Sequence, residues 1–579
     1  MTALSRFKHA IADQICRATH SKPEELMQLM RMSKSRKEGH ISISLPKLNA
    51  FLGNPVKNKR DLQPWSESMV KDFQFCNNRL INKSTSTEKD LFFTFNEPEF
   101  VRQVLQQVYH DDKTYGWSHI PKPSLTENTV LVDYSSPNIA KPFHAGHLRS
   151  TIIGNFVKRI HEALGYRVIG INYLGDWGKQ YGLLAVGFER YGDEKLLLSN
   201  PIHHLYQVYV KINADASISE DISKQANKYF KRMEEGDPKA IQQWTRFRDM
   251  SIKSYTSIYK RLNIEFDVYS GESEVNNYIP KALAMLKDQH LITHTDDGAS
   301  AVNLEEYQLG NAVVQRADGT SLYITRDLAS ILRRKELYSF AKAFYVVGRE
   351  QSNYFKQVFK IAEKMIPSSK LDLQHIGFGR IQGMSTRKGS AVFLQDILDT
   401  AKERILEYMT QDSDKSQIEN IDYIADQLGV SAIMIQDMKS KRDKNYEFAW
   451  DRVTDAKGDT GVFLQYAHAR ACGIERKAGI AVDPQCNFEL LKEKEAIDLV
   501  ELIAQFPETV QSAFSTLEPC TIVNYLFKLS HATSTASKFL RVKDMDIDTS
   551  KARLLLFWSA RATLRNGLYL LGIKPIKKM

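Results

Sequence analysis

The sequence predicts an α/β protein built on a doubly wound parallel sheet, with an α+β domain before it and an all-helical bundle after it. Between about residues 129 and 379, short apolar segments typical of strands alternate with helical patterns, as in parallel βαβ units. Ahead of that stretch, strand-like and helical patterns are mixed. From about residue 400 strand patterns nearly vanish and long amphipathic patterns run to the end, which indicates a helical bundle.

Four apolar segments define the predicted sheet. They read TVLVDYS at 129–135, RVIGINYLG at 167–175, AFYVVG at 343–348 and QHIGFG at 374–379. Between the first two, apolar residues recur at helical spacing over 146–164, and Gly165 is suited to end that helix. A mostly helical stretch rich in Lys and Glu, at about 190–265, interrupts the two halves and is expected to be an insertion.

We expect three domains, with boundaries near residues 118 and 400. They are residues 1–118, residues 119–400 with the insertion, and residues 401–579. In the first, helical patterns at 7–16 and 23–32 precede strand-like segments at 40–48 and 90–100. This mixture predicts a small α+β domain.

Composition narrows the class of protein without fixing it. Hydrophobic residues make up 42% and charged residues 26% of the 579, which is ordinary for a soluble globular protein. No run of about 18 apolar residues exists, so no membrane-spanning helix is expected. The net charge of +10 suits a polyanionic partner such as RNA, although many basic proteins bind no nucleic acid.

Cysteine usage and the N-terminus bear on the compartment. The five cysteines are scattered, with no CxxC pair, so neither a disulfide framework nor a zinc site is expected, and a reducing compartment is favoured. The first 22 residues carry four Lys or Arg and one acid, Asp13, with apolar residues between. That pattern fits either a short mitochondrial presequence or the first amphipathic helix of the fold. The basic pI favours the mitochondrial matrix; the alternative is the cytoplasm.

The strongest chemical signal is SSPNIAKPFHAGHLRS, residues 135–150, which lies between a predicted strand and a helix start. A doubly wound sheet binds its ligand at such a junction. His144 and His147 stand beside backbone amides at the helix N-terminus, where amides and helix dipole favour phosphate. Gly146 between them lets a nucleotide approach closely.

These motifs resemble those of class I aminoacyl-tRNA synthetases, and specifically of arginyl-tRNA synthetases of the eukaryotic cytosolic or mitochondrial type. HAGH is similar to the HIGH signature. The resemblance continues through NYLGDWGKQYG, DVYSGES, DGTSLYITRD, QGMSTRKG and GDTGVFLQYAHAR, and so covers nearly the whole chain. It implies a class I catalytic domain with a Rossmann-like sheet, an N-terminal domain that contacts the outer corner of tRNA, and a helical anticodon-binding domain.

Two segments compete for the second class I signature, KMSKS, whose lysine stabilises the triphosphate. RMSKS at 31–35 has the closer spelling but precedes the nucleotide fold. The other candidate follows QHIGFG, where the loop must lie; its ATP-binding residues are Met384, Ser385, Arg387 and Lys388. This segment lacks the usual second lysine, and in arginyl enzymes with a degenerate loop a lysine just before HIGH compensates. Lys141 occupies that place, so Lys141, Arg387 and Lys388 all stay candidates for the phosphate contact.

The family resemblance also implies an arginine pocket. Guanidinium is a planar, permanently charged fork that a selective site binds with carboxylates. Glu272 and Asp327 match the family's two acids, and Tyr323 lies four residues before Asp327. Asn138 and Gln351 match the positions that hold the amino and carboxylate ends of the substrate. One departure is that Tyr354 stands where the family usually has a histidine, which leaves the ribose contact unassigned.

In the C-terminal domain, aromatic residues of the helix around 458–470 are expected to stack on anticodon bases. The candidates are Phe463 and Tyr466, together with Met579 at the C-terminus. Core packing is the competing interpretation, and for Phe463 it is favoured.

The resemblance implies ATP-dependent attachment of L-arginine to tRNA(Arg) through arginyl-adenylate, with tRNA required even for the first step. Mg²⁺ is expected to arrive with ATP, because no metal site is visible in the sequence. A monomer without membrane contact is expected. Three alternatives stay open: a synthetase for glutamate or cysteine, a cytidylyltransferase, and a non-catalytic tRNA-binding relative.

Overall fold

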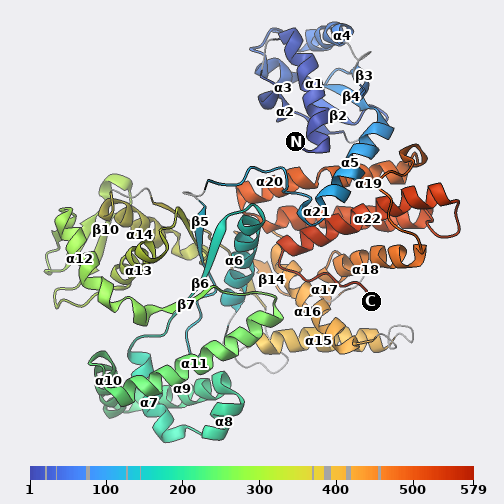
Figure 1. Ribbon diagram of the computed structural model, residues 1–579. Helices are drawn as coiled ribbons and strands as arrows, with labels where there is room; N and C mark the ends of the chain where they lie inside the picture. Colours follow the sequence, from blue (N-terminus) through green and yellow to red (C-terminus); the bar gives the residue numbers. More distant parts are fainter. Residues whose placement is uncertain are drawn as a thin grey trace.

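The computed structural model describes the chain except for residues 20–21, 34–35, 74–78, 125–127, 142, 144, 368–370, 384–392, 412–418, 454 and 456–457. The N-terminal block lies at the top of Figure 1, the parallel sheet in the centre and the C-terminal helices on the right. Two further groups of elements extend from the sheet on the left.

The central sheet has five parallel strands in the order β12-β11-β5-β6-β7. They are β5 (Thr129–Asp133), β6 (Arg167–Leu174), β7 (Val268–Gly271), β11 (Lys342–Tyr345) and β12 (Asp372–His375). The chain runs outward from β5 in one direction through β6 and β7, and from β11 in the other. The strand order therefore reverses between β5 and β11, the place where an open α/β sheet binds its ligand. This confirms the predicted doubly wound parallel sheet.

Helices cover both faces of the sheet, as its apolar strands require. They are α6 (Ala145–Ala163) on one face and α13 (Tyr323–Tyr338) with α14 (Ser352–Met365) on the other. Val130 and Val132 of β5 are buried in the cluster that contains Ile152 of α6. Leu131, which points the opposite way, is buried with Leu328 of α13.

Two insertions extend from this framework. The first is helical, as the sequence predicted, and has its own apolar core. It comprises α7 (Lys179–Tyr191), α8 (Glu194–Ser199), α9 (Pro201–Ile218), α10 (Glu220–Glu234) and α11 (Pro238–Arg261). The second was not predicted. It combines α12 (Ile279–Asp288) with an antiparallel sheet of β8 (Ile292–His294), β9 (Ser300–Asn303) and β10 (Asn311–Gln315).

The N-terminal block is an antiparallel sheet, β1-β2-β4-β3, packed against helices. Its elements are α1 (Ala3–Thr19), α2 (Pro23–Met27), β1 (Arg31–Met32), β2 (Ile41–Ser44), α3 (Leu45–Phe51), α4 (Leu62–Asp72), β3 (Ile81–Ser86), β4 (Asp90–Phe95) and α5 (Glu97–Asp111). Three predicted lengths were wrong. The helix from Pro23 ends at Met27, and both predicted strands give way to helices.

The physical reasons for the two shortened strands are helix-start signals. Pro46 lies in the first turn of α3, a position that tolerates proline. Asn96 caps α5, since its side chain accepts a hydrogen bond from the Glu99 amide at 3.5 Å. Pro98 and two acids occupy the first turn of the same helix.

The first helix belongs to the folded core. Leu4, Phe7, Ile11 and Ile15 of α1 are completely buried. Lys8 pairs with Glu508 of the C-terminal helices at 2.6 Å. This packing is expected if the N-terminal segment is the first amphipathic helix of the fold.

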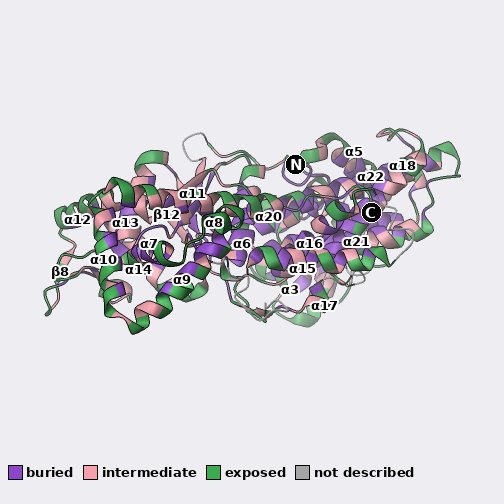
Figure 2. Ribbon diagram, turned by 90° about the horizontal axis from the view of Figure 1, so that it is seen from below, coloured by how far each residue is buried: buried purple, intermediate pink, exposed green. Residues whose placement is uncertain are grey.

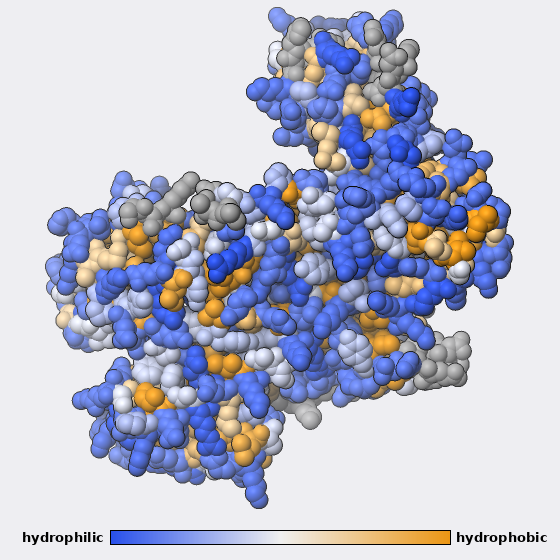
Figure 3. All heavy atoms as spheres, viewed as in Figure 1, coloured by the Kyte–Doolittle hydropathy of each residue, from blue (hydrophilic) through white to orange (hydrophobic). Residues whose placement is uncertain are grey.

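The C-terminal part is helical, and most residues of its central helices are buried (Figure 2). Its elements are α15 (Leu394–Thr410), α16 (Ile421–Met438), β14 (Tyr446–Glu447), α17 (Trp450–Val453), α18 (Gly461–Ala478), α19 (Lys494–Ala504), α20 (Phe506–Thr516), α21 (Pro519–Phe539) and α22 (Ile547–Leu570). The short strand β14 pairs with β13 (Ile381–Gln382) and so connects this part to the end of the sheet domain. The visible surface is mainly hydrophilic, with apolar side chains in separate patches (Figure 3). Among the described helices, none has the length and apolar character that crossing a membrane needs.

Candidate active site

The loop that follows β5 is held in an unusual backbone conformation. Ser135, Ser136 and Ala140 have φ of 75°, 48° and 59°, a region that residues other than glycine seldom adopt. Strain of this kind persists only where the surroundings impose it, and it gathers at functional sites. Here the Ser135 amide donates to Ser150 Oγ at 2.9 Å, and the Ser136 amide donates to Asn172 Oδ1 at 3.2 Å.

Asn138, predicted to hold one end of the arginine backbone, lies at the carboxyl edge of the sheet. Its backbone pairs with Gly175, just after β6. A Cβ on Gly175 would lie 2.0 Å from Asn138 Oδ1, so the glycine leaves the space that the amide occupies. The Tyr255 hydroxyl donates to the carbonyls of Asn138 at 2.8 Å and Lys141 at 3.0 Å. Both the side chain and the backbone of Asn138 are therefore positioned.

Helix α6 begins directly after this loop and presents its N-terminus to the switch point. Gly146 is exposed and His147 half-buried in its first turn. The His147 ring lies 5.4 Å from the buried Phe143 ring, and the His147 carbonyl accepts from Thr151 Oγ1 at 2.6 Å. The backbone amides and the dipole of a helix N-terminus favour a phosphate. His144 lies outside the described residues.

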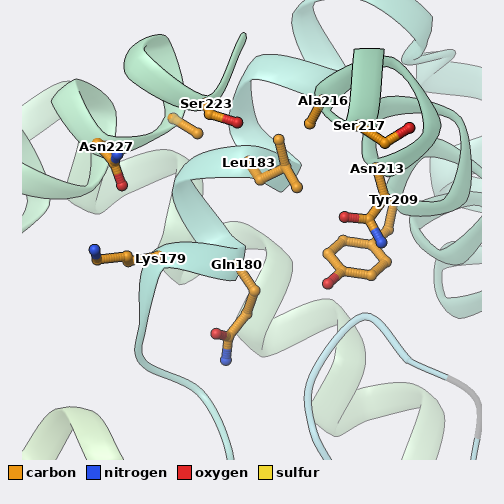
Figure 4. Close-up of a pocket in the computed structure, with 10 residues that line it drawn as sticks. Lys179, Gln180, Leu183, Tyr209, Asn213, Ala216, Ser217, Ser223 and Asn227 are labelled. Carbon is orange, nitrogen blue, oxygen red and sulfur yellow. The ribbon is translucent and has the colours of Figure 1, made fainter. Parts of the chain in front are cut away.

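Lys141 points toward the helical insertion. Its ammonium lies 5.3 Å from the centre of the Tyr209 ring in α9. Tyr209 also lines an open hollow of about 530 Å³ between α7, α9 and α10, together with Lys179, Gln180 and Asn213 (Figure 4). Of the predicted site residues that the structure describes, none lines this hollow. Lys141 thus connects the catalytic loop to the insertion.

Asp327, one of the two predicted acids, lies half-buried in α13. The Tyr354 hydroxyl of α14 donates to Asp327 Oδ2. Burial raises the pKa of Asp327 to about 6, while the Tyr354 hydrogen bond and the nearby Arg334 act in the opposite direction. Arg334 itself pairs with Asp133, the last residue of β5, at 2.7 Å. Tyr354, which the sequence left unexplained, is therefore a partner of the predicted acid.

Glu272, the second acid, follows β7 at the same edge of the sheet. Burial raises the pKa of Glu272 to about 7, opposed by Arg326 at 3.8 Å and reinforced by the charges of Asp176 and Asp327. The charge of Asp327 is among the causes that raise the pKa of Glu272, so the structure places the two predicted acids within electrostatic range of each other. Carboxylates whose pKa values are raised by burial mark a candidate functional site.

Asp176 positions this edge, although the sequence did not single it out. It is completely buried and accepts from the Ser273 amide and the Ser273 hydroxyl, each at 2.9 Å. Arg248 pairs with it at 2.9 Å. A Cβ on Gly271 would lie 2.3 Å from the Asp176 carboxylate, so this contact also needs a glycine. The GDW triplet at 175–177 was the available signal.

The other two residues predicted to contact arginine are exposed and lie at the N-terminal ends of α13 and α14. Tyr323 starts α13 and is 76% exposed, one turn before Asp327 on the same helix face. Gln351 is exposed and directly precedes α14, three residues before Tyr354. The structure brings Gln351 and Tyr323 to the helices that carry the Asp327–Tyr354 pair.

The two candidates for the second signature differ in location. Arg31 and Met32 form β1 on the N-terminal sheet, and Lys34 and Ser35 lie outside the described residues. Met384, Ser385, Arg387 and Lys388 also lie outside the described residues; the strand that precedes them, β13, follows β12.

At the helical end, the three predicted tRNA contacts differ in exposure. Tyr466 is 45% exposed, whereas Phe463 is half-buried against His531 with ring centres 4.6 Å apart. Met579 packs partly against the core. Gln465, between the aromatics, is buried; its amide donates to the Lys574 carbonyl at 2.8 Å and accepts from the Ile576 amide at 2.8 Å. Gln465 therefore fixes the C-terminal segment against α18.

The doubly wound parallel sheet, with a loop and a helix N-terminus at its switch point and a helical part after it, has the fold of a class I aminoacyl-tRNA synthetase. The family model "tRNA synthetases class I (R), catalytic domain" matches residues 114–450, and that of the DALR anticodon binding domain matches residues 464–579. The chain belongs to the arginyl-tRNA synthetase family. Among the described residues, no cluster of three or more His, Cys, Asp or Glu side chains could hold a metal ion.

Relatives and solved structures agree with this family. The chain is 42% identical to the probable cytoplasmic arginine–tRNA ligase of Dictyostelium discoideum, over 99% of this chain and 100% of that one. It is 39% identical to the probable mitochondrial arginine–tRNA ligase of Mus musculus, over 99% of each. The crystal structure of arginyl-tRNA synthetase from Plasmodium falciparum shares the fold, with a TM-score of 0.80 at 24% identity over the full length of both chains.

Proposed function

We propose that this chain attaches L-arginine to tRNA(Arg) in translation, through an arginyl-adenylate intermediate formed from ATP with its Mg²⁺. The observation that carries the substrate assignment is the pair of carboxylates, Glu272 and Asp327, brought together beside the nucleotide switch point. A guanidinium group, planar and permanently charged, is the amino-acid side chain that such a pair suits.

Two transfer steps make up the reaction. The arginine carboxylate attacks the α-phosphorus of ATP, and pyrophosphate leaves. A hydroxyl of the terminal tRNA ribose then attacks the carbonyl carbon of the adenylate, and AMP leaves. Neither step needs a protein nucleophile, so catalysis consists of positioning and of stabilising the phosphate charge.

We assign the roles by location. His144, Gly146 and His147 serve the triphosphate at the start of α6, with Met384, Ser385 and Arg387 in the second ATP-binding segment. Lys141 and Lys388 are the candidates for the lysine that stabilises the leaving pyrophosphate. Asn138 and Gln351 orient the arginine backbone, and Tyr323 closes the side-chain pocket.

The test is arginine-dependent exchange of pyrophosphate into ATP and charging of tRNA(Arg). Asp327→Ala removes a carboxylate from a partly desolvated site, which costs about 2–5 kcal/mol of arginine binding. The apparent KM for arginine should rise far more than that for ATP. Equal effects on both substrates would place the arginine pocket elsewhere. Exchange that depends on glutamate or cysteine, or cytidylyl transfer without arginine, would overturn the proposed reaction.

The tRNA contacts are proposed for both ends of the chain. We assign residues 1–118 to the outer corner of the tRNA, residues 119–400 to catalysis, and residues 401–579 to the anticodon loop, with Phe463, Tyr466 and Met579 as contacts. Tyr466 is the sharpest test because its ring is exposed. Tyr466→Ala should weaken binding by about 1–3 kcal/mol, the contribution of one stacked base. An unchanged Kd for tRNA would remove it from the interface.

We propose a monomer in the mitochondrial matrix, with the cytoplasm as the alternative compartment. Relatives include cytoplasmic and mitochondrial enzymes alike, so the basic pI carries the preference. Light scattering of the purified protein and fractionation of cells that express it test the two proposals.

A further inference from the structure

Residues 441–448, which we call the brace segment, follow α16 and lie against both α6 and the chain between β12 and β13. On one side, Arg149 of α6 donates from Nη1 to the Lys444 carbonyl at 2.8 Å. On the other, Arg442 donates to the Gly377 carbonyl at 2.8 Å and accepts, through its own carbonyl, the Gly379 amide at 2.9 Å. The brace segment thus bridges α6 and the chain between β12 and β13.

The contact with β13 continues to the edge of the second signature. The Tyr446 amide donates to Arg380 at 3.1 Å, and the Phe448 amide donates to Gln382 at 2.8 Å. A Cβ on Gly379 would lie 2.6 Å from the Lys444 carbonyl, so the two backbones approach as closely as glycine permits. Residues 377–382 therefore lie alongside the brace segment, joined to it by backbone hydrogen bonds.

One buried ion pair fixes α16, the helix that leads into the brace segment, to α6. Arg149 and Asp437, the latter in α16, have side chains 0% and 1% exposed, and their Nε and Oδ1 atoms lie 3.2 Å apart. The Arg149 guanidinium also lies 5.1 Å from the centre of the Tyr446 ring. Arg149 stands two residues after His147. It therefore holds α16, the brace segment and the first signature in one arrangement.

Helix α16 continues this path toward the proposed anticodon contacts. Gln465 of α18 donates to Ser431 Oγ of α16 at 2.9 Å. A Cβ on Gly461 would lie 2.1 Å from the Ser431 carbonyl, so α16 and α18 pack backbone to backbone. Tyr466 follows Gln465 on α18, and Gln465 also binds the C-terminal segment.

We propose that the buried Arg149–Asp437 pair is a positioning device that holds the brace segment, and residues 377–382 beside it, against the start of α6 for adenylate formation. The inference rests on the function proposed above and deepens it. Because Arg149 of α6 binds both Asp437 and the Lys444 carbonyl, the pair fixes the brace segment relative to α6. The backbone of residues 377–382 is hydrogen-bonded to the brace segment, so the pair also sets the position of these residues relative to the start of α6.

A purely stabilising role makes a different prediction. Replacing a buried ion pair by apolar residues of similar volume is often neutral or stabilising, whereas removing one partner leaves an unpaired buried charge. A double variant, Arg149→Met with Asp437→Leu, should therefore recover the Tm of the wild type. If the pair served stability alone, activity would recover with it.

The experiment compares wild type, Asp437→Asn, the double variant and a control, Glu493→Gln, in the full-length protein. Glu493 pairs with Arg553 at 2.6 Å within the helical end, away from the brace segment. Pyrophosphate exchange is measured at saturating arginine, ATP and tRNA, alongside the Kd for tRNA and the Tm. We expect Asp437→Asn and the double variant to lose about tenfold or more in kcat, the scale of a misplaced reacting group. The KM for arginine and the Kd for tRNA should stay within about twofold, and the control should keep the wild-type kcat.

Two results would overturn the proposal. One is a double variant with wild-type kcat, and the other is a loss of kcat that follows the Tm across all variants, control included. Failure of the proposed function is separate, because the wild-type protein itself would then lack arginine-dependent exchange.

Discussion

Replacing Tyr354 with phenylalanine tests whether the Tyr354 hydrogen bond keeps Asp327 of the proposed arginine pocket ionised. The substitution removes only the hydroxyl that donates to Asp327 Oδ2, and the ring keeps its packing beside Phe355 and the surrounding apolar cluster. A donor to a carboxylate favours the ionised form. Loss of the hydroxyl should therefore raise the pKa of Asp327 above its value of about 6.

The size of the effect follows from the strength of that hydrogen bond. A hydrogen bond to a charged group contributes about 1.5–3 kcal/mol, and 1.36 kcal/mol corresponds to one pKa unit. The pKa of Asp327 should rise to roughly 7–8, so that at pH 7 only about a tenth to a half of the carboxylate is ionised. The wild-type group is about nine-tenths ionised at that pH. The KM for arginine should increase about two- to tenfold.

The assay is the KM for arginine in tRNA charging, measured from pH 6 to pH 9. The defect should be largest at low pH and shrink as pH rises through the new pKa, because both proteins are then ionised. Tyr307→Phe is the matched control, since its ring lies beneath Lys360 in the same part of the chain but away from the acids. An increase in KM that is the same at every pH, or none at pH 6, would refute the reasoning.

Three further predictions concern other parts of the site. Gly175→Ala places a Cβ 2.0 Å from Asn138 Oδ1 and should displace that side chain. In the exchange assay, kcat/KM for arginine should fall tenfold or more, which corresponds to about 1.4 kcal/mol. Unchanged kinetics would show that the Asn138 amide plays no part. Lys388→Ala should slow adenylate formation by ~10²-fold, the effect of losing one donor to the transition state. Lys34→Ala should leave the rate nearly unchanged. A large loss at Lys34 with little at Lys388 would move the second signature to the N-terminal block. Deletion of residues 1–110 should raise the Kd for tRNA without changing the KM for ATP, and equal tRNA affinity in a folded truncation would assign that block another role.

The parallel sheet was predictable because its strands are buried on both faces and so appear as continuous apolar runs. The helix after β5 was predictable for a similar reason, since its apolar residues recur at helical spacing. The N-terminal strands were predicted too long because alternation was followed past helix-start signals. Pro46 and Asn96 with Pro98 were those signals, and their meaning depends on position rather than on hydropathy.

Motifs in the sequence singled out the loop after β5 and the two acids proposed for the site, whereas the residues that support them were not singled out. Asp176 and Arg334 look like ordinary surface charges in the sequence. In the fold, Asp176 binds Ser273 and Arg334 binds Asp133, and both charged side chains are buried. These partners lie 97 and 201 residues away in the sequence. Such pairings arise from sheet topology, which periodicity does not reveal. The Arg149–Asp437 pair escaped prediction for the same reason.

The strained loop after β5 also has a calorimetric consequence. Each of Ser135, Ser136 and Ala140 adopts a backbone conformation that costs about 1–3 kcal/mol, and this cost is met when the chain folds, before any substrate arrives. Nucleotide binding at this loop then orders little additional backbone. Titration calorimetry with ATP should accordingly give a small heat-capacity change, without the large negative value that accompanies folding coupled to binding. We therefore expect that ordering of Ser135, Ser136 and Ala140 does not limit the association rate for ATP.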